Sequence, residues 1–433
     1  MEVKEERSRD VPEIAEEKHQ RPNYTLPENG KPVFVEPDLE FIQLLLKQTG
    51  NSYKKCMQCG TCSATCDISQ ESRPFPGKEM AWAAWGMKNR LLVDPDVWLC
   101  HQCNDCSTRC PRNARPGDLL AAVRQESVKH YAFPRFLARW ANEPQSLLLL
   151  FGIPILLLSL ALGLKDSIEK ALGIAPTASN DIIFAYSSLL PHWMLIGFFT
   201  LFSILAIALV SVSIKKLWTS MKAPYGIGDS FKPPKSAFSC FVSTVKKVFM
   251  HNDFASCTRT SPRFWSHIFV FYGFISLCVV CFWIVTARIN PLIHTEFIYP
   301  FSFWSPWKVL ANFGGLLLTT GCLLMIWNRF FDLEDTHSGT YFDWVFLSTL
   351  LLVVVTGFAT EVLHYIHLDP HRHLIYFVHL VFVLALILYL PYSKFAHLAY
   401  RTTALVFVEY FGGNNGASNL KQNADSLSAE EIK

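Results

Sequence analysis

Two cysteine runs of identical spacing constrain this chain more than any other feature. Both read C-x2-C-x2-C-x3-C, the first from Cys56 to Cys66 and the second from Cys100 to Cys110. Three cysteines on so tight a loop can each direct a thiolate at one corner of an iron–sulfur cube. Thirty-three residues separate the runs. The sequence therefore predicts two such loops within one small domain.

The same spacing occurs in bacterial ferredoxins, in which the fourth cysteine of each run ligates the other cluster. We therefore expect crossed ligands. The second run ends in Cys-Pro, as ferredoxins do, whereas the first ends in Cys-Asp, a departure that leaves the ligands intact. The two predicted [4Fe–4S] ligand sets are Cys56, Cys59, Cys62 and Cys110, and Cys100, Cys103, Cys106 and Cys66.

Two other cysteine chemistries fit this pattern less well. A structural zinc site closes with four ligands, and two runs of four cysteines exceed that need. Disulfide-dense domains are small and secreted, whereas this chain has 433 residues and starts MEVKEERSRD, without the apolar segment of a secretory signal. Reduced thiolates indicate a reducing, cytoplasmic compartment for the cysteine domain.

The chain around the two runs is expected to be helical. Residues 1–36 are charged and interrupted by proline, and are interpreted as a flexible arm. Helical periodicity then covers residues 39–49, residues 77–93 between the runs, and residues 117–130 after them. No stretch alternates as a strand, so residues 37–135 are predicted to form an α-helical ferredoxin-type domain.

Composition and long apolar runs predict a membrane protein. Half of the residues are apolar, and the net charge of only +3 argues against a nucleic-acid partner. We expect a mainly α fold, in which a six-helix transmembrane bundle over residues 146–400 follows the cysteine domain and residues 401–433 form a tail. Six runs approach the roughly twenty residues that cross a bilayer: residues 147–164, 192–214, 264–286, 309–327, 344–366 and 373–395.

Lysine and arginine give the bundle an orientation. Residues 215–263 carry nine of them, whereas residues 289–307 carry none, so the positive-inside rule predicts that the first segment is cytoplasmic. With six spans, both termini and the clusters would lie on that side. Within the basic segment, an apolar stripe predicts an amphipathic helix on the leaflet, with docking of a partner protein as the alternative: Phe238, Phe241, Val242, Val245 and Phe249.

Histidines in the apolar runs are candidate haem ligands, because an ionisable side chain within a membrane segment is costly and by default functional. His379 and His397 are eighteen residues apart. On a single last helix they would share a face, roughly 27 Å apart, and suit one haem near each membrane surface. His267, at the cytoplasmic start of the third run, matches His397 in depth and is its predicted partner. A protein with this one haem also fits.

The second ligand of an outer haem leaves alternatives open. His364 ends the fifth run and is the preferred partner of His379. The alternatives are His367 and His192, although for His192, as for His371 and His373, an interfacial position is preferred over ligation. Histidines outside the runs, such as His251, are expected at the surface.

Glu361 is a carboxylate well inside an apolar run, three residues before His364. A quinol releases two protons with its two electrons, so a buried carboxylate beside the outer haem can accept one. The alternative is a packing glutamate that pairs with a neighbouring arginine or histidine.

Together these features resemble known redox modules. The cysteine runs, with Trp98 just before the second, resemble the small iron–sulfur subunit of heterodisulfide reductases. Residues 192–397 resemble the cytochrome b subunit of respiratory nitrate reductases and the membrane subunit of heterodisulfide reductases. In the nitrate reductase pattern a second histidine stands ten residues beyond the position of His267, where this chain has Leu277. The fusion resembles the membrane-embedded iron–sulfur subunit of the quinone-interacting membrane-bound oxidoreductase (Qmo) complexes of sulfate reducers.

The resemblance implies a function. Such a subunit passes electrons between menaquinone and two cytoplasmic flavin and iron–sulfur subunits through b haems, in the service of adenylylsulfate reductase. The resemblance thus implies that this chain is an electron-transfer subunit of a quinone-dependent oxidoreductase in the cytoplasmic (inner) membrane. This chain has no Cys-Cys pair and no Gly-rich dinucleotide fingerprint, so disulfide chemistry and flavin would belong to partners. Alternatives are the membrane anchor of a heterodisulfide- or sulfite-reductase complex and, more remotely, a transporter with a metal-bearing regulatory domain.

Overall fold

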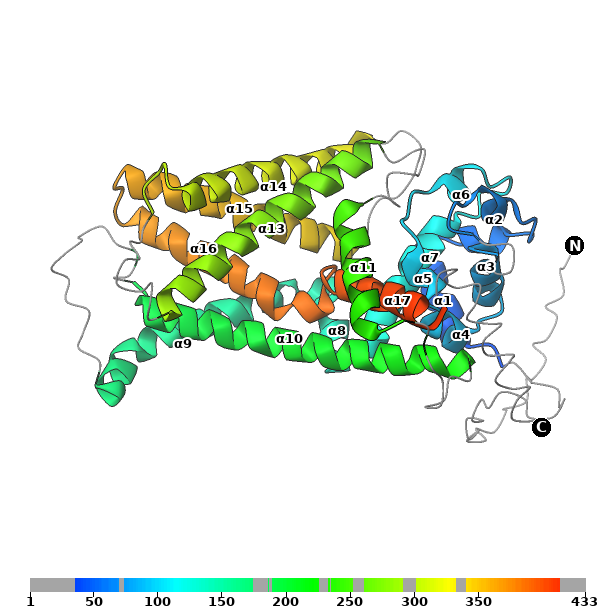
Figure 1. Ribbon diagram of the computed structural model, residues 1–433, viewed down its shortest axis with the longest axis horizontal. Coiled ribbons are helices and arrows are strands. Elements are labelled where there is room, and N and C mark those ends of the chain that lie inside the picture. Colours follow the sequence, from blue (N-terminus) through cyan, green and yellow to red (C-terminus); the bar gives the residue numbers. More distant parts are fainter. Residues whose placement is uncertain are drawn as a thin grey trace, which may run out of the picture. The chain divides into compact units, whose positions relative to one another are not determined.

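The fold is helical throughout the part of the chain that the computed structural model describes (Figure 1). No strand occurs among those residues, which confirms the predicted mainly α class. Of the predicted arm, residues 1–35 lie outside this part. The described residues are 36–69, 74–173, 186, 189–225, 233, 235–251, 261–290, 301–331 and 340–412.

Short helices build the cysteine domain. Asp38 starts the first of them, since its side chain accepts a hydrogen bond from Phe41 N at 2.9 Å, and Gly50 ends it with φ of 59°. A 3-10 turn, Ser52–Lys55, leads into the first cysteine run. The helices are α1 (Leu39–Thr49), α2 (Thr61–Thr65), α3 (Gly77–Ala84), α4 (Lys88–Val93), α5 (Asp96–Leu99), α6 (Asp105–Thr108) and α7 (Pro116–Tyr131).

The single helix predicted over residues 77–93 is wrong, because α3 and α4 are separate. Gly86 between them has φ of 69°, a left-handed conformation that ends a helix and that glycine adopts without strain. A Cβ at this position would also lie 2.8 Å from Ile42 Cδ1. The break lets α1 pack closely against the link, where Gly86 O accepts a hydrogen bond from Asp38 N at 3.1 Å.

The core of the cysteine domain lies between α1, α3, α4 and α7. Leu45, Leu91 and Leu119 are fully buried in it, together with Tyr53. Each such leucine contributes about 1.5–3 kcal/mol by leaving water. The cysteine loops lie at the edge of this core, and Cys56, Cys66 and Cys110 pack against it.

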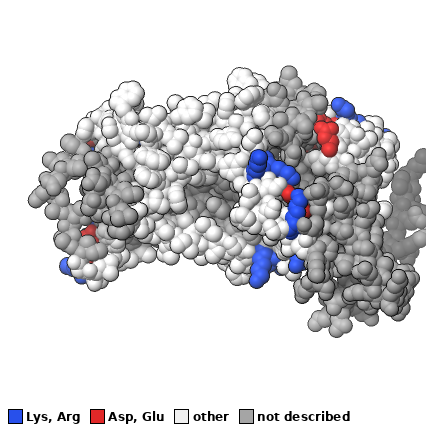
Figure 2. Space-filling model, in the orientation of Figure 1, with Lys and Arg blue, Asp and Glu red and all other residues white. Residues whose placement is uncertain are grey.

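Six helices are long and apolar enough to cross a membrane, as predicted. Their surface forms a broad band almost without charged side chains in Figure 2. The first extends past residue 164 to Leu172, although Pro154 lies within it. The helices are α9 (Leu147–Leu172), α10 (His192–Lys222), α13 (Ser261–Ile289), α14 (Pro306–Phe331), α15 (Tyr341–Tyr365) and α16 (His371–Leu388).

Close packing of α13 and α14 depends on glycine. A Cβ at Gly273 would lie 2.6 Å from Leu318 N, and one at Gly321 would lie 2.7 Å from Val270 N. Such backbone contact is how small residues bring membrane helices together. It fixes α13, which carries His267, relative to its neighbour.

The last predicted run is not one helix that reaches His397. α16 ends at Leu388, a 3-10 turn follows over Leu390–Tyr392, and α17 covers Ala396–Gly412. Pro391 has no backbone N–H and cannot continue the helix. The argument that His379 and His397 share one helical face is therefore wrong. The tail predicted from residue 401 is also wrong in its first part, since α17 continues to Gly412 and buries Phe407 and Phe411.

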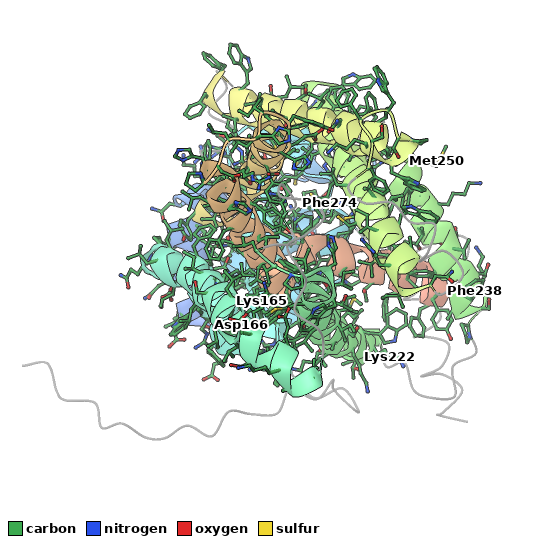
Figure 3. The ribbon with its side chains drawn as sticks, turned by 90° about the vertical axis from the view of Figure 1, so that its left-hand side faces the viewer. Lys165, Asp166, Lys222, Phe238, Met250 and Phe274 are labelled. Atoms are coloured by element: carbon green, nitrogen blue, oxygen red, sulfur yellow. The ribbon has the colours of Figure 1, made fainter. Side chains whose placement is uncertain are left out.

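The predicted amphipathic helix is present as α11 (Ala237–Met250). It packs on α17 through Cys240 and Thr244, and Lys247 Nζ lies 3.2 Å from a Glu409 carboxylate oxygen. The apolar stripe faces away from this contact, and Phe238 is 76% exposed. Figure 3 shows Phe238 and Met250 at the outside of the bundle and Phe274 toward its centre. The leaflet position of α11 stays a prediction.

Candidate functional site

The structure gathers the cysteines in two groups. In the first group, burial raises the pKa of the Cys62 thiol, and the neighbouring thiols of Cys56 and Cys110 raise it further. Cys59 is exposed, and the Thr61 hydroxyl, 3.3 Å from its sulfur, lowers the pKa of Cys59. Cys110 of the second run thus lies with cysteines of the first.

The second group likewise combines cysteines of both runs. Burial raises the pKa of Cys66 to about 11, and the thiols of Cys100 and Cys103 add to the effect. Cys106 is buried, and its pKa is raised by burial and by the same two thiols together with Cys66. A fourth cysteine of the first run therefore lies among the first three of the second.

The donor sets fit two [4Fe–4S] clusters with crossed ligands. The second group offers four sulfurs, the number that one such cluster needs, and the first offers three, with Cys59 of the same run as the expected fourth. Backbone N–H groups also donate to sulfur, from Gln102 N to Cys100 Sγ at 3.2 Å and from Ala114 N to Cys110 Sγ at 3.3 Å. Hydrogen bonds of this kind stabilise thiolates and tune the potential of a bound cluster.

The two loops have the same backbone. Gln58 and Gln102, at matching positions, both have φ of 56°, and Gly60 and Asn104 have φ of 77° and 67°. Glycine and asparagine are the residues that adopt this left-handed conformation most readily. The shared spacing therefore encodes a shared loop geometry.

Arg401 of α17 binds the loop of the second run. Its Nη1 donates to Cys100 O at 2.9 Å, and its Nη2 donates to Leu99 O at 3.2 Å and lies 2.8 Å from His101 Nδ1. Hydrogen bonds from a charged donor are about twice as strong as neutral ones. The guanidinium fixes the cluster loop to the helix that carries His397 in its first turn.

Trp98 completes this junction. It is fully buried, with its ring centroid 5.6 Å from that of His397 and 5.2 Å from that of Tyr400. Its Nε1 has no hydrogen-bond partner in the described part of the chain. Trp98 therefore bridges the second cysteine run and α17 with an unused donor.

Four histidines meet at the junction, and we call them the histidine cluster: His101, His251, His267 and His397. The rings of His251 and His267 lie 5.4 Å apart. Burial lowers the pKa of His101 to about 3, and Arg401, Arg124, His251 and His267 lower it further. Burial also holds the pKa of His397 well below its ordinary value, with added effects of Arg124, Arg401, Lys394 and His267. The predicted pair His267 and His397 thus lies in one cluster.

The prediction that His251 lies at the surface is wrong. Only 8% of it is exposed, and its Nδ1 lies 2.9 Å from Phe249 O. A proton on Nδ1 directed at a carbonyl leaves Nε2 available as a ligand. Sequence reasoning missed His251 because it follows an amphipathic helix rather than lying in an apolar run, and missed His101 although it adjoins Cys100.

A cavity opens beside the histidine cluster. Its empty volume, which includes space open to solvent, is about 680 Å³. The Trp98 ring lines it together with polar and charged side chains from the second cysteine loop, α7, the link before α17 and α17 itself, which are Gln102, Arg124, Lys394 and His397.

His379 lies against α15. Its Nδ1 is 3.1 Å from both Val353 O and Thr356 Oγ1, and a Cβ at Gly357 would lie 3.3 Å from its Cε1. His364 is seven residues beyond Gly357, which is about 10 Å along a helix. The structure does not bring His364 to His379. Instead, the His364 ring lies 5.5 Å from that of Tyr186 and 6.3 Å from that of His367.

Glu361 forms an ion pair between the neighbouring helices α14 and α15. One carboxylate oxygen lies 3.1 Å from Lys308 Nζ and 3.2 Å from Asn312 Nδ2. This agrees with the alternative of a packing glutamate, except that the cation is a lysine. Its predicted role in proton transfer stays a prediction.

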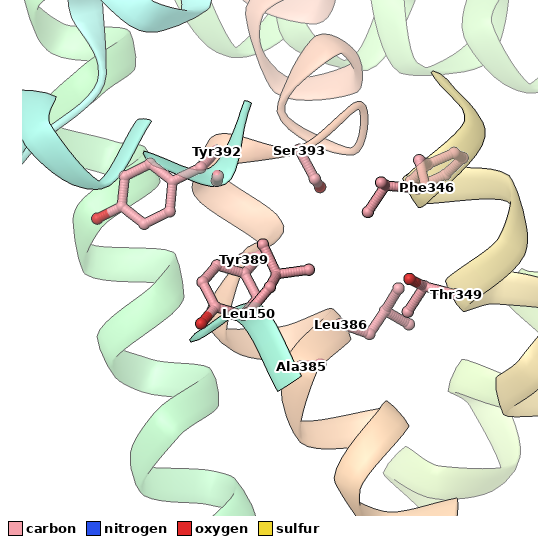
Figure 4. Close-up of a pocket in the computed structure, with 10 residues that line it drawn as sticks. Leu150, Phe346, Thr349, Ala385, Leu386, Tyr389, Tyr392 and Ser393 are labelled. Carbon is pink, nitrogen blue, oxygen red and sulfur yellow. The ribbon is translucent and has the colours of Figure 1, made fainter. Parts of the chain in front are cut away.

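A second, mostly apolar cavity lies within the bundle, between α9, α15 and α16 (Figure 4). Its empty volume is about 450 Å³. Leu150, Phe346 and Leu386 line it, and Thr349 and Tyr389 add hydroxyl groups. Apolar walls with a few hydroxyls suit a lipophilic ring that carries oxygen atoms.

Comparison with known protein families agrees with this two-part organisation. The 4Fe-4S dicluster domain model matches residues 52–114. The model named Citrate utilization protein B matches residues 142–411. No solved structure matches the chain.

Curated relatives fall into the same two groups. Citrate utilization protein B of Escherichia coli is 28% identical over 396 residues, which cover 86% of this chain and 92% of that protein. The C subunit of the H(2):CoB-CoM heterodisulfide,ferredoxin reductase of Methanothermobacter marburgensis is 32% identical over 93 residues, 21% of this chain and 50% of that subunit. A protein of Archaeoglobus profundus, named for its likeness to the C subunit of heterodisulfide reductase, is 35% identical over 78 residues, 18% of this chain and 42% of that protein. The chain thus spans about half of these heterodisulfide reductase relatives.

Proposed function

This chain belongs to the Citrate utilization protein B family, and on that premise we propose that it links the menaquinone pool to soluble redox subunits. The proposed protein is a membrane electron-transfer subunit with b haems in the bundle and two [4Fe–4S] clusters in the cysteine domain. Its relatives named as heterodisulfide reductase iron–sulfur subunits belong to complexes of several subunits. The cysteine domain and the C-terminus would lie on the cytoplasmic side.

The junction between the two domains is the observation that carries the proposal. Arg401 binds the backbone of Leu99 and Cys100, while Trp98 of the same segment contacts His397. A residue of the second cysteine set and a proposed haem ligand are therefore held on one rigid unit. A short, fixed separation between redox groups is what electron transfer requires.

The eight cysteines would hold the clusters in the crossed sets, and His267 and His397 would hold the inner haem. When bound, these groups supply one-electron chemistry. Trp98, Arg124 and Lys394 line the cavity beside His397. They provide hydrogen-bond donors and positive charge for the carboxylate groups that a haem carries.

For an outer haem we propose His379 as a ligand, because its Nδ1 already faces the carbonyl of Val353 and its Nε2 is directed elsewhere. His364, proposed from the sequence as the second ligand, lies about two helical turns from the residues that face His379. His192 and His367 therefore remain alternatives. Glu361 is proposed as a proton acceptor beside this site.

The most specific part of the proposal is the identity of the soluble protein that receives the electrons. The resemblance to the Qmo membrane subunit suggests delivery of electrons toward adenylylsulfate reductase through flavin and iron–sulfur subunits. The names of the relatives suggest instead citrate use or heterodisulfide reduction. The chain has no Cys-Cys pair, which supports a conduit in each case, with substrate chemistry on a partner.

An anaerobic optical and EPR titration of the purified chain, with iron, acid-labile sulfide and haem measured on the same sample, tests the proposal. We expect two cluster signals and haem, all reduced by a menaquinol analogue. One haem would leave His267 and His397 as the only pair. Clusters without any haem would contradict the proposed conduit. A separate test replaces Glu361 by Gln: if quinol-driven reduction of the haem is unchanged, this residue has no part in the mechanism.

A further inference from the structure

We propose that the exposed surface around the first cysteine run is a docking site for an acidic redox protein. We call this surface the basic rim, and it consists of Lys54, Lys55, Arg109 and Arg112 around Met57 and Cys59. The inference rests on the proposed function, and it adds the chemistry of the partner: a surface rich in carboxylates.

Around its second cysteine, the first run is more exposed than the second run. Cys59 and Gly60 are exposed, and Met57 is 57% exposed. At the matching positions of the second run, Cys103 is half-buried and Asn104 is buried. A soluble partner can therefore approach the first cysteine set closely.

The four cations come from two distant parts of the sequence. Lys54 and Lys55 directly precede Cys56, and Arg109 and Arg112 flank Cys110. Because α2 of the first run packs against α6 of the second, the fold brings the two segments near each other. No local run of basic residues in the sequence reveals this patch.

The charges of the rim face outward. All four side chains are exposed, and none has an ion-pair partner in the part of the chain that the structure describes. By contrast, Lys78 in the same domain contacts three carboxylates. Asp105, the acid within the runs, is half-buried, whereas Asp67, which directly follows Cys66 of the other set, is exposed.

Position and charge together favour a soluble protein. In Figure 1, α2 and α6 lie on the side of the cysteine domain away from the transmembrane helices. Opposite charges on two surfaces raise association rates about 10–10³-fold at low salt, and an exposed apolar residue such as Met57 can be buried at the centre of the contact. Because the Debye length is about 8 Å at physiological ionic strength, such binding weakens as salt is added.

Binding of an acidic flavodoxin to the full chain in uncharged nanodiscs tests this inference. Titrations at low and high sodium chloride would compare the wild type with Lys54→Glu/Lys55→Glu and with Arg109→Gln/Arg112→Gln. The matched control is Lys215→Glu/Lys246→Glu, which reverses two exposed lysines elsewhere. We expect the rim pairs to weaken binding at least about tenfold and to flatten its salt dependence, and the control pair to bind like the wild type.

Three outcomes would overturn the docking site. The control pair could weaken binding as much as the rim pairs, so that only net charge matters. The rim pairs could bind like the wild type, which would leave the cations to balance the cluster charge alone. The rim pairs could instead lose affinity only for vesicles of anionic lipid, which would make the surface a membrane contact. Iron and sulfide are measured on each sample: absence of clusters from the wild type contradicts the proposed function and not the docking, and rim variants are compared at equal cluster content.

Discussion

The two cysteine runs have the same spacing and the same loop backbone, yet they lie in opposite surroundings. The first presents Met57 and Cys59 to solvent, while the second is held by Arg401 and covered by Trp98. Residues outside the repeat make this difference. On the functions proposed above, loops of identical spacing would serve different tasks, one toward the membrane helices and one toward a soluble partner.

The largest expected effect is the loss of a whole cluster when one of its crossed cysteine ligands is replaced. Cys66→Ser is expected to remove the cluster of the second run, although Cys66 belongs to the first, and to lower iron and sulfide by about half. Its EPR spectrum should match that of Cys106→Ser. Cys110→Ser should instead match Cys59→Ser. Spectra that group by sequence run rather than by these pairs would contradict the crossed assignment.

The junction gives the next largest effect. Arg401→Met leaves Leu99 O and Cys100 O without their donor, and we expect it to destabilise the second loop by about 2 kcal/mol. Loss of cluster absorbance on heating measures this, and the EPR signal of the first cluster should be unchanged. Arg401→Lys keeps the charge but not the fork of donors, so an intermediate effect is expected. Equal loss at both clusters would show that Arg401 stabilises the whole domain.

Substitutions at two glycines, Gly117 and Gly60, allow the packing around the two cysteine loops to be compared. A Cβ at Gly117 would lie 2.1 Å from Asn104 Oδ1, whereas a Cβ at Gly60 has nothing within 4 Å. We expect Gly117→Ala to cost about 1–3 kcal/mol through overpacking. Gly60→Ala should cost about 1–2 kcal/mol, from its left-handed backbone alone. Thermal unfolding of both variants checks the order, and a larger loss for Gly60→Ala would reverse the comparison.

The smallest expected effect on stability comes from Glu79 on α3, between the two cysteine runs, and it depends on pH. Burial raises the pKa of Glu79 well above its ordinary value, Asp94 and Asp96 raise it further, and Lys78 opposes them. A carboxyl whose pKa is raised by folding stabilises the fold below its ordinary pKa, and this contribution is lost as pH rises through the folded value. Glu79→Gln should therefore gain stability relative to the wild type as pH rises. A difference in melting temperature that is constant with pH would contradict this.

Much of the fold followed from sequence, because its signals are local. Helix α1 has Asp38 and Gly50 at its ends, and the six apolar runs need only their own length and composition to be recognised. Errors arose where a local signal was extended too far. Helix periodicity continued through Gly86 and Pro391, and each of these residues ends a helix for a backbone reason that periodicity does not register.

The sequence by itself determined the cofactor chemistry of the cysteine domain and the presence of a membrane bundle. Cysteine spacing sets which sulfurs can share a cluster, and apolar length sets what can cross a bilayer. Only the tertiary structure decided which cysteine run meets the bundle. It also decided that His101 and His251 join His267 and His397, and that α2 of the first run packs against α6 of the second. These contacts join residues far apart in the chain, and their geometry depends on how helices pack.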